Sequence, residues 1–528
     1  MSNHAYESAA ALRPSSNGPI PISTLCERFS LAPASAEDAA ALNDLSILGV
    51  SVDSADTAPG ELFVGLPGFT VHGARFAADA VASGAVAVLT DADGAQIVHQ
   101  TAPGTPVLVH SDPRAVVGPL SAEVYHHPAR GLVTTAVTGT NGKTTTAYFL
   151  DAILSAHVGG CMVAGTVELR VGERSVESPR TTVEAPVLQR MMALAVEDKV
   201  GAASLEASSH AIVLHRLDGI VVDVAGFTNL QRDHLDFHKT MEGYLEAKAQ
   251  LFTPEHARRG VVCVDDQWGA ALAAEAPIEI DRVRAYPGET PADWWVSDAA
   301  VSLTDSATTF TLHGPDGEQI EASCPLPGLV NVQNAALALV MAIRAGVPAA
   351  TATAALAGAH NIPGRMQRIS QRDGRRGLCI VDFAHTPEAM ELALKAVRPI
   401  TPGRLIVVFG SDGDRDQGKR PMLGEVCARL ADVLVVTDEN PRSEDPQLIR
   451  NAILEGVRGV RPDLTDVEEI TTWRGDAVRR GVELCGPDDT VIVTGKGHEP
   501  FLEMAGEFIR YNDAPVMAEA VEEKWGRA

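Results

Sequence analysis

A glycine loop between a β-branched run and a helical pattern constrains this chain more than any other stretch. Residues 133–138 are rich in β-branched side chains, residues 139–142 are Gly-Thr-Asn-Gly, and Lys143-Thr144-Thr145 opens a helix-like segment. In a strand–loop–helix unit, the loop N–H groups and the helix N-terminus converge on an anion. A lysine at this place reaches the β- and γ-phosphates, and the next threonine offers its hydroxyl to Mg²⁺. The stretch therefore predicts an ATP site, although the general pattern has glycine where Val137 stands.

The length and charge of the chain limit its organisation and its partners. A chain of 528 residues is too long for one hydrophobic core and predicts about three domains. The formal net charge of −26 argues against nucleic acid or an anionic membrane as the main partner. An anionic substrate stays open, because local basic side chains and helix N-termini bind phosphate even in acidic proteins.

The cysteines and the first residues predict a reduced, cytoplasmic location. The seven cysteines are scattered and include no C-x-x-C pair, so neither a disulfide framework nor a zinc site is expected. The beginning of the chain is polar and lacks the apolar segment of a signal peptide. No apolar run approaches membrane-spanning length, so no membrane insertion is expected.

Alternating apolar runs and helical patterns predict an α/β fold in three parts. We expect a smaller N-terminal α/β domain over residues 1–130, a central domain with a mostly parallel P-loop-type sheet over 131–361, and a Rossmann-like C-terminal domain over 362–528. Residues 1–20 are expected to form a loose extension. Buried strands are predicted at 85–90, 106–109, 133–138, 201–206, 220–227, 260–264, 378–382, 405–409, 433–437 and 490–494, and a helix at 334–345.

Charged residues gather after the predicted strands of the C-terminal segment. Arg415 lies in a loop after one strand, Glu439 and Arg442 follow the next, and Glu499 follows the last. Open α/β sheets bind ligands beyond the carboxyl ends of their strands. Guanidinium groups pair with carboxylates, and a glutamate accepts hydrogen bonds from an ammonium group. The pattern predicts a site for a zwitterionic amino acid, with salt bridges between surface loops as the alternative.

Three further features are ambiguous on their own. Glu206 follows a strand and is either a Mg²⁺ ligand or a surface residue that caps a helix. The stretch Asp233–His238 suggests a loop near a metal but fits a solvated turn equally well. Lys248 lies in a helix-like segment, where a lysine usually faces solvent.

Taken together, these motifs resemble those of the Mur ligases, which add amino acids to the bacterial cell-wall precursor. Residues 139–145 match that family's variant of the phosphate loop, and the stretches 206–210 and 227–238 match two further motifs. The stretch 53–65 resembles one in the ligases that act third in the pathway, with Ala55 in place of an arginine. The motifs follow one another in the family's order over nearly the whole chain.

The resemblance implies an ATP site with metal ions and catalytic groups. The implied catalytic residues are Lys143, Lys248, His234 and Arg365. The implied ATP contacts are Gly139, Thr140, Asn141, Gly142, Lys143, Thr144, Thr145, Asn334, Arg365 and Asp382. The implied Mg²⁺ ligands are Thr144, Glu206, His234 and Lys248, the last as N6-carboxylysine. A lysine ammonium would repel Mg²⁺, whereas the carbamate formed with CO₂ provides an anionic oxygen.

The resemblance also implies two substrate sites. The implied UDP-substrate residues are Ser54, Thr181, Thr182, Ser208 and Arg216. The implied amino-acid-binding residues are Arg415, Glu439, Asn440, Pro441, Arg442, Gly495 and Glu499. Residues 439–442 resemble the "D-N-P-R" signature of members that add meso-diaminopimelate, whose second carboxylate the arginine binds. Two departures stand out: Glu439 replaces the aspartate of that signature, and Ser411-Asp412 stand where Cys-Gly is common.

An ATP-dependent amide ligase of peptidoglycan precursor synthesis, active as a monomer, is the activity that the resemblance implies. It would join UDP-MurNAc-L-Ala-D-Glu and meso-diaminopimelate through an acyl phosphate, with ATP and Mg²⁺. L-lysine or L-ornithine as the acceptor stays open, and so does a catalytically silent relative that binds the precursor. The uridine-type N-terminal segment and the Asn-Pro-Arg stretch argue against a folylpolyglutamate-synthase-like ligase.

Overall fold

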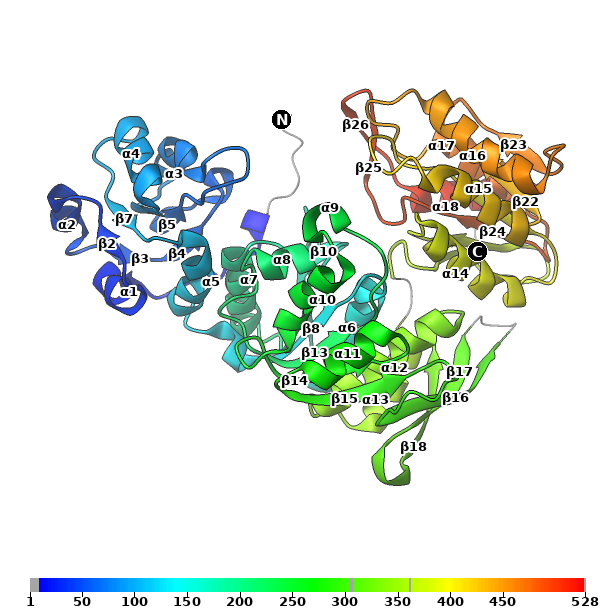
Figure 1. Cartoon of the computed structure of the whole chain (residues 1–528), viewed down its shortest axis with the longest axis horizontal. Helices are drawn as coiled ribbons and strands as arrows, with labels where there is room; N and C mark the ends of the chain where they lie inside the picture. The colour runs from blue at the N-terminus through cyan, green and yellow to red at the C-terminus, as the bar shows by residue number, and fades with distance from the viewer. Residues whose placement is uncertain (1–8, 303–306, 360–361, 527–528) are drawn as a thin grey trace. The chain divides into compact units, whose positions relative to one another are not determined.

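The computed structural model describes residues 9–302, 307–359 and 362–526 (Figure 1). It forms two compact units, Met1–Trp295 with Ala336–Ala355, and Val296–Ala335 with Leu356–Ala528. The divisions fall inside strand β16 (Trp294–Val301), inside helix α12 (Leu329–Arg344) and near the end of helix α13 (Ala349–Ala357). The predicted boundaries after residues 130 and 361 stay predictions, and residue 361 lies outside the described residues.

The N-terminal part of the first unit contains a five-stranded sheet of order β2-β7-β6-β5-β4. Four strands are parallel and β2 is antiparallel to β7. Apolar clusters cover both faces, as expected for parallel strands that are buried on both sides. The strands are β2 (Ala32–Pro33), β4 (Gly49–Ser51), β5 (Glu61–Val64), β6 (Ala87–Thr90) and β7 (Val107–Val109), and β1 (Ile20–Pro21) pairs separately with β3 (Ser46–Ile47). The helices are α1 (Ile22–Phe29), α2 (Ala36–Leu42), α3 (Ala77–Ala82), α4 (Ala92–Thr101) and α5 (Pro113–Val124).

The prediction of a loose N-terminal extension is wrong for the described residues 9–20. Leu12 is fully buried in the apolar cluster of the central sheet. Arg13 pairs with Asp56 and Glu61, which belong to the N-terminal sheet and its loops. The amide of Asn17 donates to two main-chain carbonyl oxygens at 2.7 and 2.9 Å. Residues 9–17 are therefore an ordered strap despite their mostly polar composition, because Leu12, Arg13 and Asn17 each contact other parts of the first unit.

The central sheet has the strand order β11-β10-β9-β12-β8-β13-β14-β15-β16-β17-β18. All neighbours from β9 to β16 are parallel, and β10, β11, β17 and β18 are in antiparallel pairs. The remaining strands are β8 (Val133–Thr138), β9 (Cys161–Ala164), β10 (Glu168–Val171), β11 (Arg174–Glu177), β12 (Ala202–Glu206), β13 (Val222–Phe227), β14 (Ala257–Cys263), β15 (Glu279–Arg284), β17 (Thr308–His313) and β18 (Gln319–Cys324). The helices are α6 (Lys143–Val158), α7 (Ala185–Glu197), α8 (Ser209–Val213), α9 (Leu235–His238), α10 (Met241–Ala249), α11 (Gln267–Glu275), α12 (Leu329–Arg344) and α13 (Ala349–Ala357).

The register of the central sheet determines which strand ends lie beside the phosphate loop. Strand β8 lies between β12 and β13, with Val137 opposite Glu206 and Thr138 opposite Phe227. Three parallel strands therefore end side by side where the phosphate loop begins. This edge is where open α/β sheets bind ligands.

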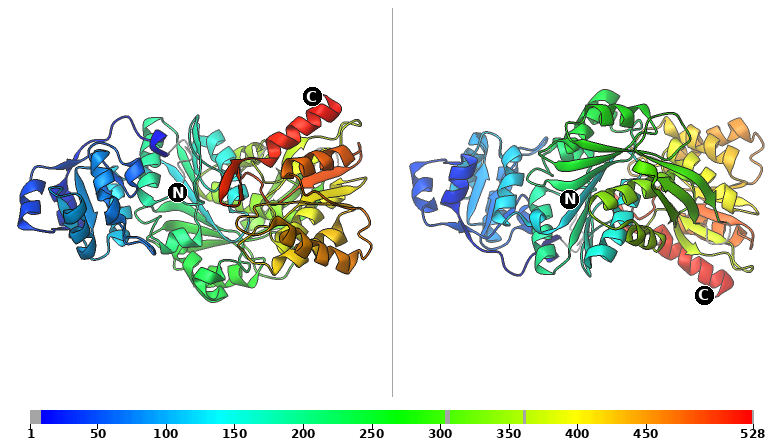
Figure 2. Two further views of the ribbon diagram at one scale, coloured as in Figure 1. Left: turned by 90° about the horizontal axis from the view of Figure 1, so that it is seen from above. Right: turned by 90° about the horizontal axis from the view of Figure 1, so that it is seen from below.

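The C-terminal sheet has the order β19-β20-β24-β21-β22-β23, parallel except for β19. Alternate strand residues pack on α17 and α18, so the other helices take the opposite face (Figures 1 and 2). The strands are β19 (Gln367–Ser370), β20 (Leu378–Val381), β21 (Leu405–Phe409), β22 (Val433–Val436), β23 (Val467–Glu469) and β24 (Thr490–Val493), with a hairpin of β25 (Phe501–Met504) and β26 (Glu507–Arg510). The helices are α14 (Pro387–Val397), α15 (Lys419–Leu430), α16 (Pro446–Val460), α17 (Arg474–Leu484) and α18 (Asp513–Trp525).

The predicted α/β fold class is confirmed by these three sheets, of which the central one is mostly parallel. Within the described ranges, none of the helices combines the length and the apolar character needed to cross a membrane.

Candidate active site

The phosphate loop adopts a conformation that only glycine accommodates at its first position. Gly139 has φ +145°, and a Cβ atom there would lie 1.8 Å from Oγ1 of Thr228. Gly142, with φ 88°, precedes the first turn of α6, whose N-terminal N–H groups point toward the loop. The strand–loop–helix arrangement predicted from the sequence is therefore present.

The loop after β13 holds the phosphate loop in shape, a role that the sequence did not indicate. Thr140 N donates to the carbonyl oxygen of Asn229 at 2.9 Å, and Asn141 N donates to Asn229 Oδ1 at 3.1 Å. The hydroxyl of Thr228 donates to the carbonyl oxygen of Asn141 at 2.6 Å, and the Asn141 amide donates to Gln231 Oε1 at 2.8 Å. Side chains that bond to main-chain groups of another loop leave no signal in spacing or composition.

Two lysines bind the same stretch of backbone. Lys143 Nζ donates to the carbonyl oxygens of Gly139 and Thr140 at 3.0 and 2.8 Å. Lys248 Nζ donates to Gly139 O at 2.8 Å and lies 4.4 Å from the ring centre of Tyr244. Lys248 is only 1% exposed, so it does not lie on a solvated helix face. Burial, and then the charge of Lys143, lower the pKa of Lys248 well below its ordinary value.

Glu206 is a buried carboxylate whose hydrogen-bond donors are neutral. It is 1% exposed, and Oε2 accepts from the hydroxyls of Thr144 and Thr166 at 3.0 Å each. Oε1 accepts from Thr166 N at 2.8 Å. A Cβ atom at Gly165 would lie 2.2 Å from Oε1, so glycine is needed beside it. Glu206 is therefore neither exposed nor a helix cap.

The residues predicted for the sugar-peptide substrate come together beside Glu206. The hydroxyl of Thr182 donates to the main-chain oxygen of Glu206 at 2.6 Å and accepts from Ser208 N at 3.0 Å. Arg216 Nη1 donates to Thr182 O at 3.1 Å. Thr181 bonds to Thr166 through their hydroxyls at 3.2 Å. Thr166 thus contacts both the predicted metal ligand and the predicted substrate loop, and sequence reasoning missed it because a lone threonine carries no pattern.

The histidine-rich stretch forms an aromatic cluster. His234 precedes α9 at its N-cap position with φ 52°, and its ring centre lies 4.9 Å from that of His210. His238 stacks on Tyr244 at 4.8 Å and bonds to the hydroxyl of Ser209 at 2.8 Å. Burial lowers the pKa of His234, which favours the neutral imidazole that can ligate a metal.

The predicted uridine end of the site lies in the N-terminal part. Ser54 begins the 3₁₀ turn Ser54–Asp56, which Asp53 caps by accepting from Ala55 N. Phe69, in the loop that follows β5, is 91% exposed. Asp56 pairs at 2.9 Å with Arg190, a fully buried residue of α7. This pair connects the Ser54 turn to the helix that follows Thr181 and Thr182.

The residues predicted to contact ATP from the second unit lie on α12, just before β19 and just after β20. Asn334 is 2% exposed, and its Oδ1 has no hydrogen-bond partner among the described residues. Asp382 accepts from Met366 N at 2.8 Å and from Ala384 N at 2.9 Å. The guanidinium of Arg365 lies 4.3 Å from the ring centre of Phe383. These contacts keep Arg365 and Asp382 close together.

The acceptor residues predicted at the C-terminal sheet also converge. Asn440 Nδ2 donates to Glu499 Oε2 at 3.0 Å. Lys496, which is fully buried, donates to Asn440 Oδ1 at 2.8 Å and to Glu499 Oε2 at 3.0 Å. Lys496 lacked a predicted role and emerges as the group that orients both neighbours. Gly495 has φ 105°, and a Cβ there would lie 2.4 Å from Oε2 of Glu439.

Glu439 and Arg442 occupy different environments. Glu439 is 3% exposed, and burial together with the charge of Asp412 raises its pKa to about 8. Arg442 lies 3.8 Å from Asp412 and 3.7 Å from Glu503. Pro441 precedes it and bounds the turn by contact with Gly413. Arg415 is exposed in the loop after β21, and its role in binding the amino acid stays a prediction.

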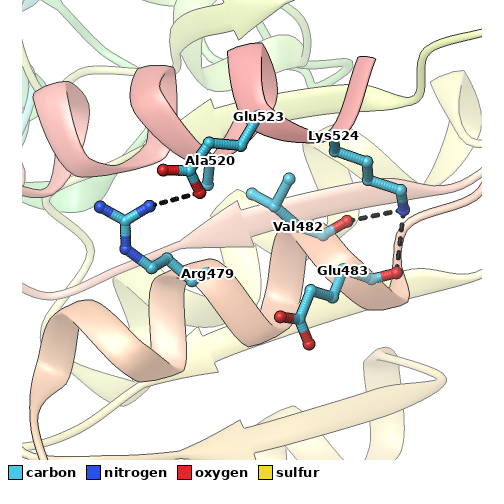
Figure 3. Close-up of a pocket in the computed structure, with 6 residues that line it drawn as sticks. All are labelled: Arg479, Val482, Glu483, Ala520, Glu523 and Lys524. Atoms are coloured by element: carbon cyan, nitrogen blue, oxygen red, sulfur yellow. Dashed lines mark hydrogen bonds and ion pairs between the residues drawn. The ribbon is translucent and has the colours of Figure 1, made fainter. Parts of the chain in front are cut away.

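A cavity elsewhere is unrelated to these residues. It has a volume of about 320 Å³ and lies between α17 and α18 (Figure 3). Lys524 donates there to the carbonyl oxygens of Val482 and Glu483, and Arg479 pairs with Glu523. The charged side chains in this cavity bond to each other or to carbonyl oxygens at the end of α17, so we regard it as a structural crevice.

Over the described ranges, no three His, Cys, Asp or Glu side chains gather as a ready-made metal site.

Comparison with known proteins decides the family. Three family models match: "Mur ligase family, catalytic domain" over residues 46–125, "Mur ligase middle domain" over 137–342, and "Mur ligase, glutamate ligase domain" over 364–497. The chain is 43% identical over 483 residues to the UDP-N-acetylmuramoyl-L-alanyl-D-glutamate–2,6-diaminopimelate ligase of Streptomyces avermitilis, covering 92% of this chain and 94% of that one. The chain belongs to the Mur ligase family.

Two further relatives of this Mur ligase extend the comparison. A UDP-N-acetylmuramyl-tripeptide synthetase of Leifsonia xyli subsp. xyli is 42% identical over 508 residues, covering 95% of this chain and 96% of the relative. A solved structure of a UDP-N-acetylmuramoyl-L-alanyl-D-glutamate–2,6-diaminopimelate ligase, 31% identical, has a TM-score of 0.63 and covers 90% and 95% of the two chains. Mur ligases are ATP-dependent ligases of peptidoglycan precursor synthesis, so the predicted enzyme class and the use of ATP are confirmed.

Proposed function

We propose that this Mur ligase joins meso-diaminopimelate to the free γ-carboxylate of UDP-MurNAc-L-Ala-D-Glu. The observation that carries the proposal is the position of Glu206. Its carboxylate accepts from Thr144 of the phosphate loop, and its main-chain oxygen accepts from Thr182 of the predicted substrate loop. The predicted nucleotide residues and the predicted sugar-peptide residues are therefore both bonded to one buried residue, which supports the proposal. The name of the Streptomyces relative supports both substrates.

The reaction proceeds in two transfers. A carboxylate oxygen of the substrate attacks the γ-phosphorus of ATP, and ADP leaves with the electrons of the broken P–O bond. The acceptor nitrogen then attacks the acyl carbon, phosphate leaves with the electrons of the C–O bond, and the nitrogen loses a proton. Lys143, held at the phosphate loop, stabilises charge on the transferring phosphoryl group, and Arg365 is assigned the same task.

The residues around the phosphate loop fit Mg²⁺. Glu206 is almost fully buried, and its hydrogen-bond donors among the described residues are two hydroxyl groups and one amide, none of which is charged. We assign Thr144 and Glu206 to one ion, and His234 with carbamylated Lys248 to a second. When bound, Mg²⁺ neutralises negative charge on the phosphate oxygens.

The environment of Lys248 supports carbamylation. Only an uncharged amine attacks CO₂, and burial beside Lys143 disfavours the ammonium form of Lys248. The amine nitrogen bonds to the carbon of CO₂ and loses a proton, which leaves an anionic carbamate. With isotope-labelled bicarbonate, the carbon NMR spectrum should show a carbamate signal that Lys248→Ala lacks. A bare amine at saturating bicarbonate would contradict the assignment.

The acceptor is tested by ADP release with UDP-MurNAc-L-Ala-D-Glu, ATP and one of meso-diaminopimelate, L-lysine or L-ornithine. Diaminopimelate should be preferred, and Arg442→Ala should abolish that preference while Arg429→Ala, an exposed α15 residue, preserves it. Preference for lysine or ornithine would contradict the proposed acceptor. An absence of turnover with all three would point to a silent precursor-binding relative.

A further inference from the structure

Two opposite charges at the acceptor site are near each other but not hydrogen-bonded. Arg442 Nη2 and Asp412 Oδ2 are 3.8 Å apart, and Arg442 Nε and Glu503 Oε2 are 3.7 Å apart. Both distances exceed a hydrogen bond. In the described part of the chain, Nε of Arg442 and Oδ1 of Asp412 are buried atoms without a hydrogen-bond partner. Buried polar atoms are normally satisfied, so each has bonding capacity left for a ligand.

The backbone fixes both residues. Arg442 has φ 55°, its N–H donates to Glu503 O at 3.0 Å, and Ala505 N donates to its carbonyl oxygen at 2.7 Å. Gly413, next to Asp412, donates to Asn440 O at 2.8 Å. The carbonyl oxygen of Asp412 itself accepts from Arg420 at 3.1 Å. The two side chains therefore start from rigid positions at the ends of neighbouring strands β21 and β22.

The neighbouring Glu439 does not compete for a cation at neutral pH. Burial and the charge of Asp412 raise the pKa of Glu439 to about 8, so Glu439 retains its proton at pH 7. The hydroxyl of Ser411, which is 1% exposed, is a further buried atom without a partner within the described ranges. The end of β21 therefore has two oxygen atoms, Ser411 Oγ and Asp412 Oδ1, that bond to no donor among the described residues.

We propose that Asp412 is a specificity-determining residue that receives the distal ammonium group of the acceptor, beside the distal carboxylate already assigned to Arg442. The inference rests on the proposed function. The far end of meso-diaminopimelate is itself a zwitterion, with one ammonium and one carboxylate on the same carbon. A guanidinium and a carboxylate with free bonding capacity, a few ångströms apart, complement that end.

The competing explanation is that Asp412 only offsets the charge of Arg442. In that case, loss of the Asp412 charge would change the use of every acceptor that reaches Arg442, whether or not the acceptor has a distal ammonium. The two explanations therefore differ in their dependence on acceptor chemistry.

Three acceptors separate the two contacts: meso-diaminopimelate carries both distal groups, L-lysine only the ammonium, and L-2-aminopimelate only the carboxylate. We would measure kcat/KM for each with wild type, Asp412→Asn and Arg442→Met. A hydrogen bond to a charged group contributes enough for a change of about 10- to 100-fold. In Asp412→Asn, kcat/KM should fall by about that factor with diaminopimelate and with lysine and should not change with aminopimelate. In Arg442→Met, kcat/KM should fall by that factor with diaminopimelate and with aminopimelate and should not change with lysine.

The controls keep the outcomes distinct. Glu455→Gln, an exposed change on α16, should alter none of the three values. Asp412→Gly, which leaves the residue common in the family, repeats the test if the asparagine variant folds poorly, and ADP binding reports an intact nucleotide site. An equal loss with all three acceptors, or no loss, would overturn the role of Asp412. A wild type that turns over none of them would overturn the proposed function itself.

Discussion

At the scale of single residues, the site depends on buried carboxylates whose surroundings differ. Glu206 has neutral donors only, which suits a bound cation. Glu439 is buried, and its burial and the charges of Asp412 and Glu499 raise its pKa against the opposing charges of Lys419 and Arg474, which suits a protonated carboxyl group. A glutamate can therefore serve as an anion at one site and as a neutral acid at another, because burial and neighbouring charges set its protonation.

Removal of the Thr166 hydroxyl should weaken the sugar-peptide site and the Mg²⁺ site together. Thr166→Val keeps the shape of the side chain but removes bonds to Glu206 and Thr181. We expect the KM for the UDP-substrate and the Mg²⁺ concentration for half-maximal rate each to rise about tenfold. Steady-state kinetics with a Mg²⁺ titration measures both. Thr309→Val, on the exposed side of β17, should change neither, and a rise in only one of the two values would argue against a shared role.

The raised pKa of Glu439 should make stability fall as pH rises. Between about pH 5 and pH 8 the folded chain holds the Glu439 proton and the unfolded chain does not, so deprotonation favours unfolding. Over this range the free energy of unfolding of wild type should fall by about 3 kcal/mol more than that of Glu439→Gln. Urea unfolding at several pH values measures the difference. Glu507→Gln, on the exposed hairpin, should follow wild type; an equally steep fall in Glu439→Gln would contradict the prediction.

At the scale of elements, the phosphate loop is held by two sets of contacts. The loop after β13 bonds to its main chain, and the lysines of α6 and α10 bond to its carbonyl oxygens. Because β8 and β13 are neighbours in register, the supporting loop starts beside the loop that it supports.

Gly139→Ala should disable the nucleotide site without unfolding the chain. The added Cβ would lie 1.8 Å from Thr228 Oγ1 and would need a φ of +145°, which L side chains rarely adopt. Strain of this kind costs about 1–3 kcal/mol, so ADP should bind at least about tenfold more weakly. Isothermal titration calorimetry measures it. Gly459→Ala, where the Cβ meets nothing within 4 Å, should bind ADP as wild type does, and normal affinity in Gly139→Ala would refute the steric argument.

At the scale of the whole molecule, each compact unit contains part of the chemistry. The phosphate loop, Glu206 and the predicted sugar-peptide residues belong to the first unit, and the acceptor residues belong to the second. Within the first unit, residues 9–17 tie the N-terminal sheet to the central one.

Leu12→Ala should destabilise the first unit, because Leu12 is fully buried in the central cluster. Truncation of a buried leucine costs about 2–4 kcal/mol through lost burial and a residual cavity. Urea unfolding followed by hydrogen exchange in α7 would detect the loss. Leu448→Ala, at a side chain that is 62% exposed, should cost less than about 0.5 kcal/mol. A similar small cost for Leu12→Ala would mean that the strap is loose after all.

The sequence by itself determined the α/β class, the strand–loop–helix unit at 133–158 and most buried strands, because hydrophobic periodicity and the positions of glycines are local properties of the chain. It also predicted that the site residues would lie together, since polar residues that follow parallel strands meet at one edge of a sheet. Only the tertiary structure decided that Lys248 and Glu206 are buried, that Thr166, Asn229 and Lys496 support the site, and that residues 9–17 form a strap. Those outcomes depend on contacts between residues far apart in the chain, and burial sets the charge of a lysine or a glutamate through surroundings that its own neighbours in sequence do not specify.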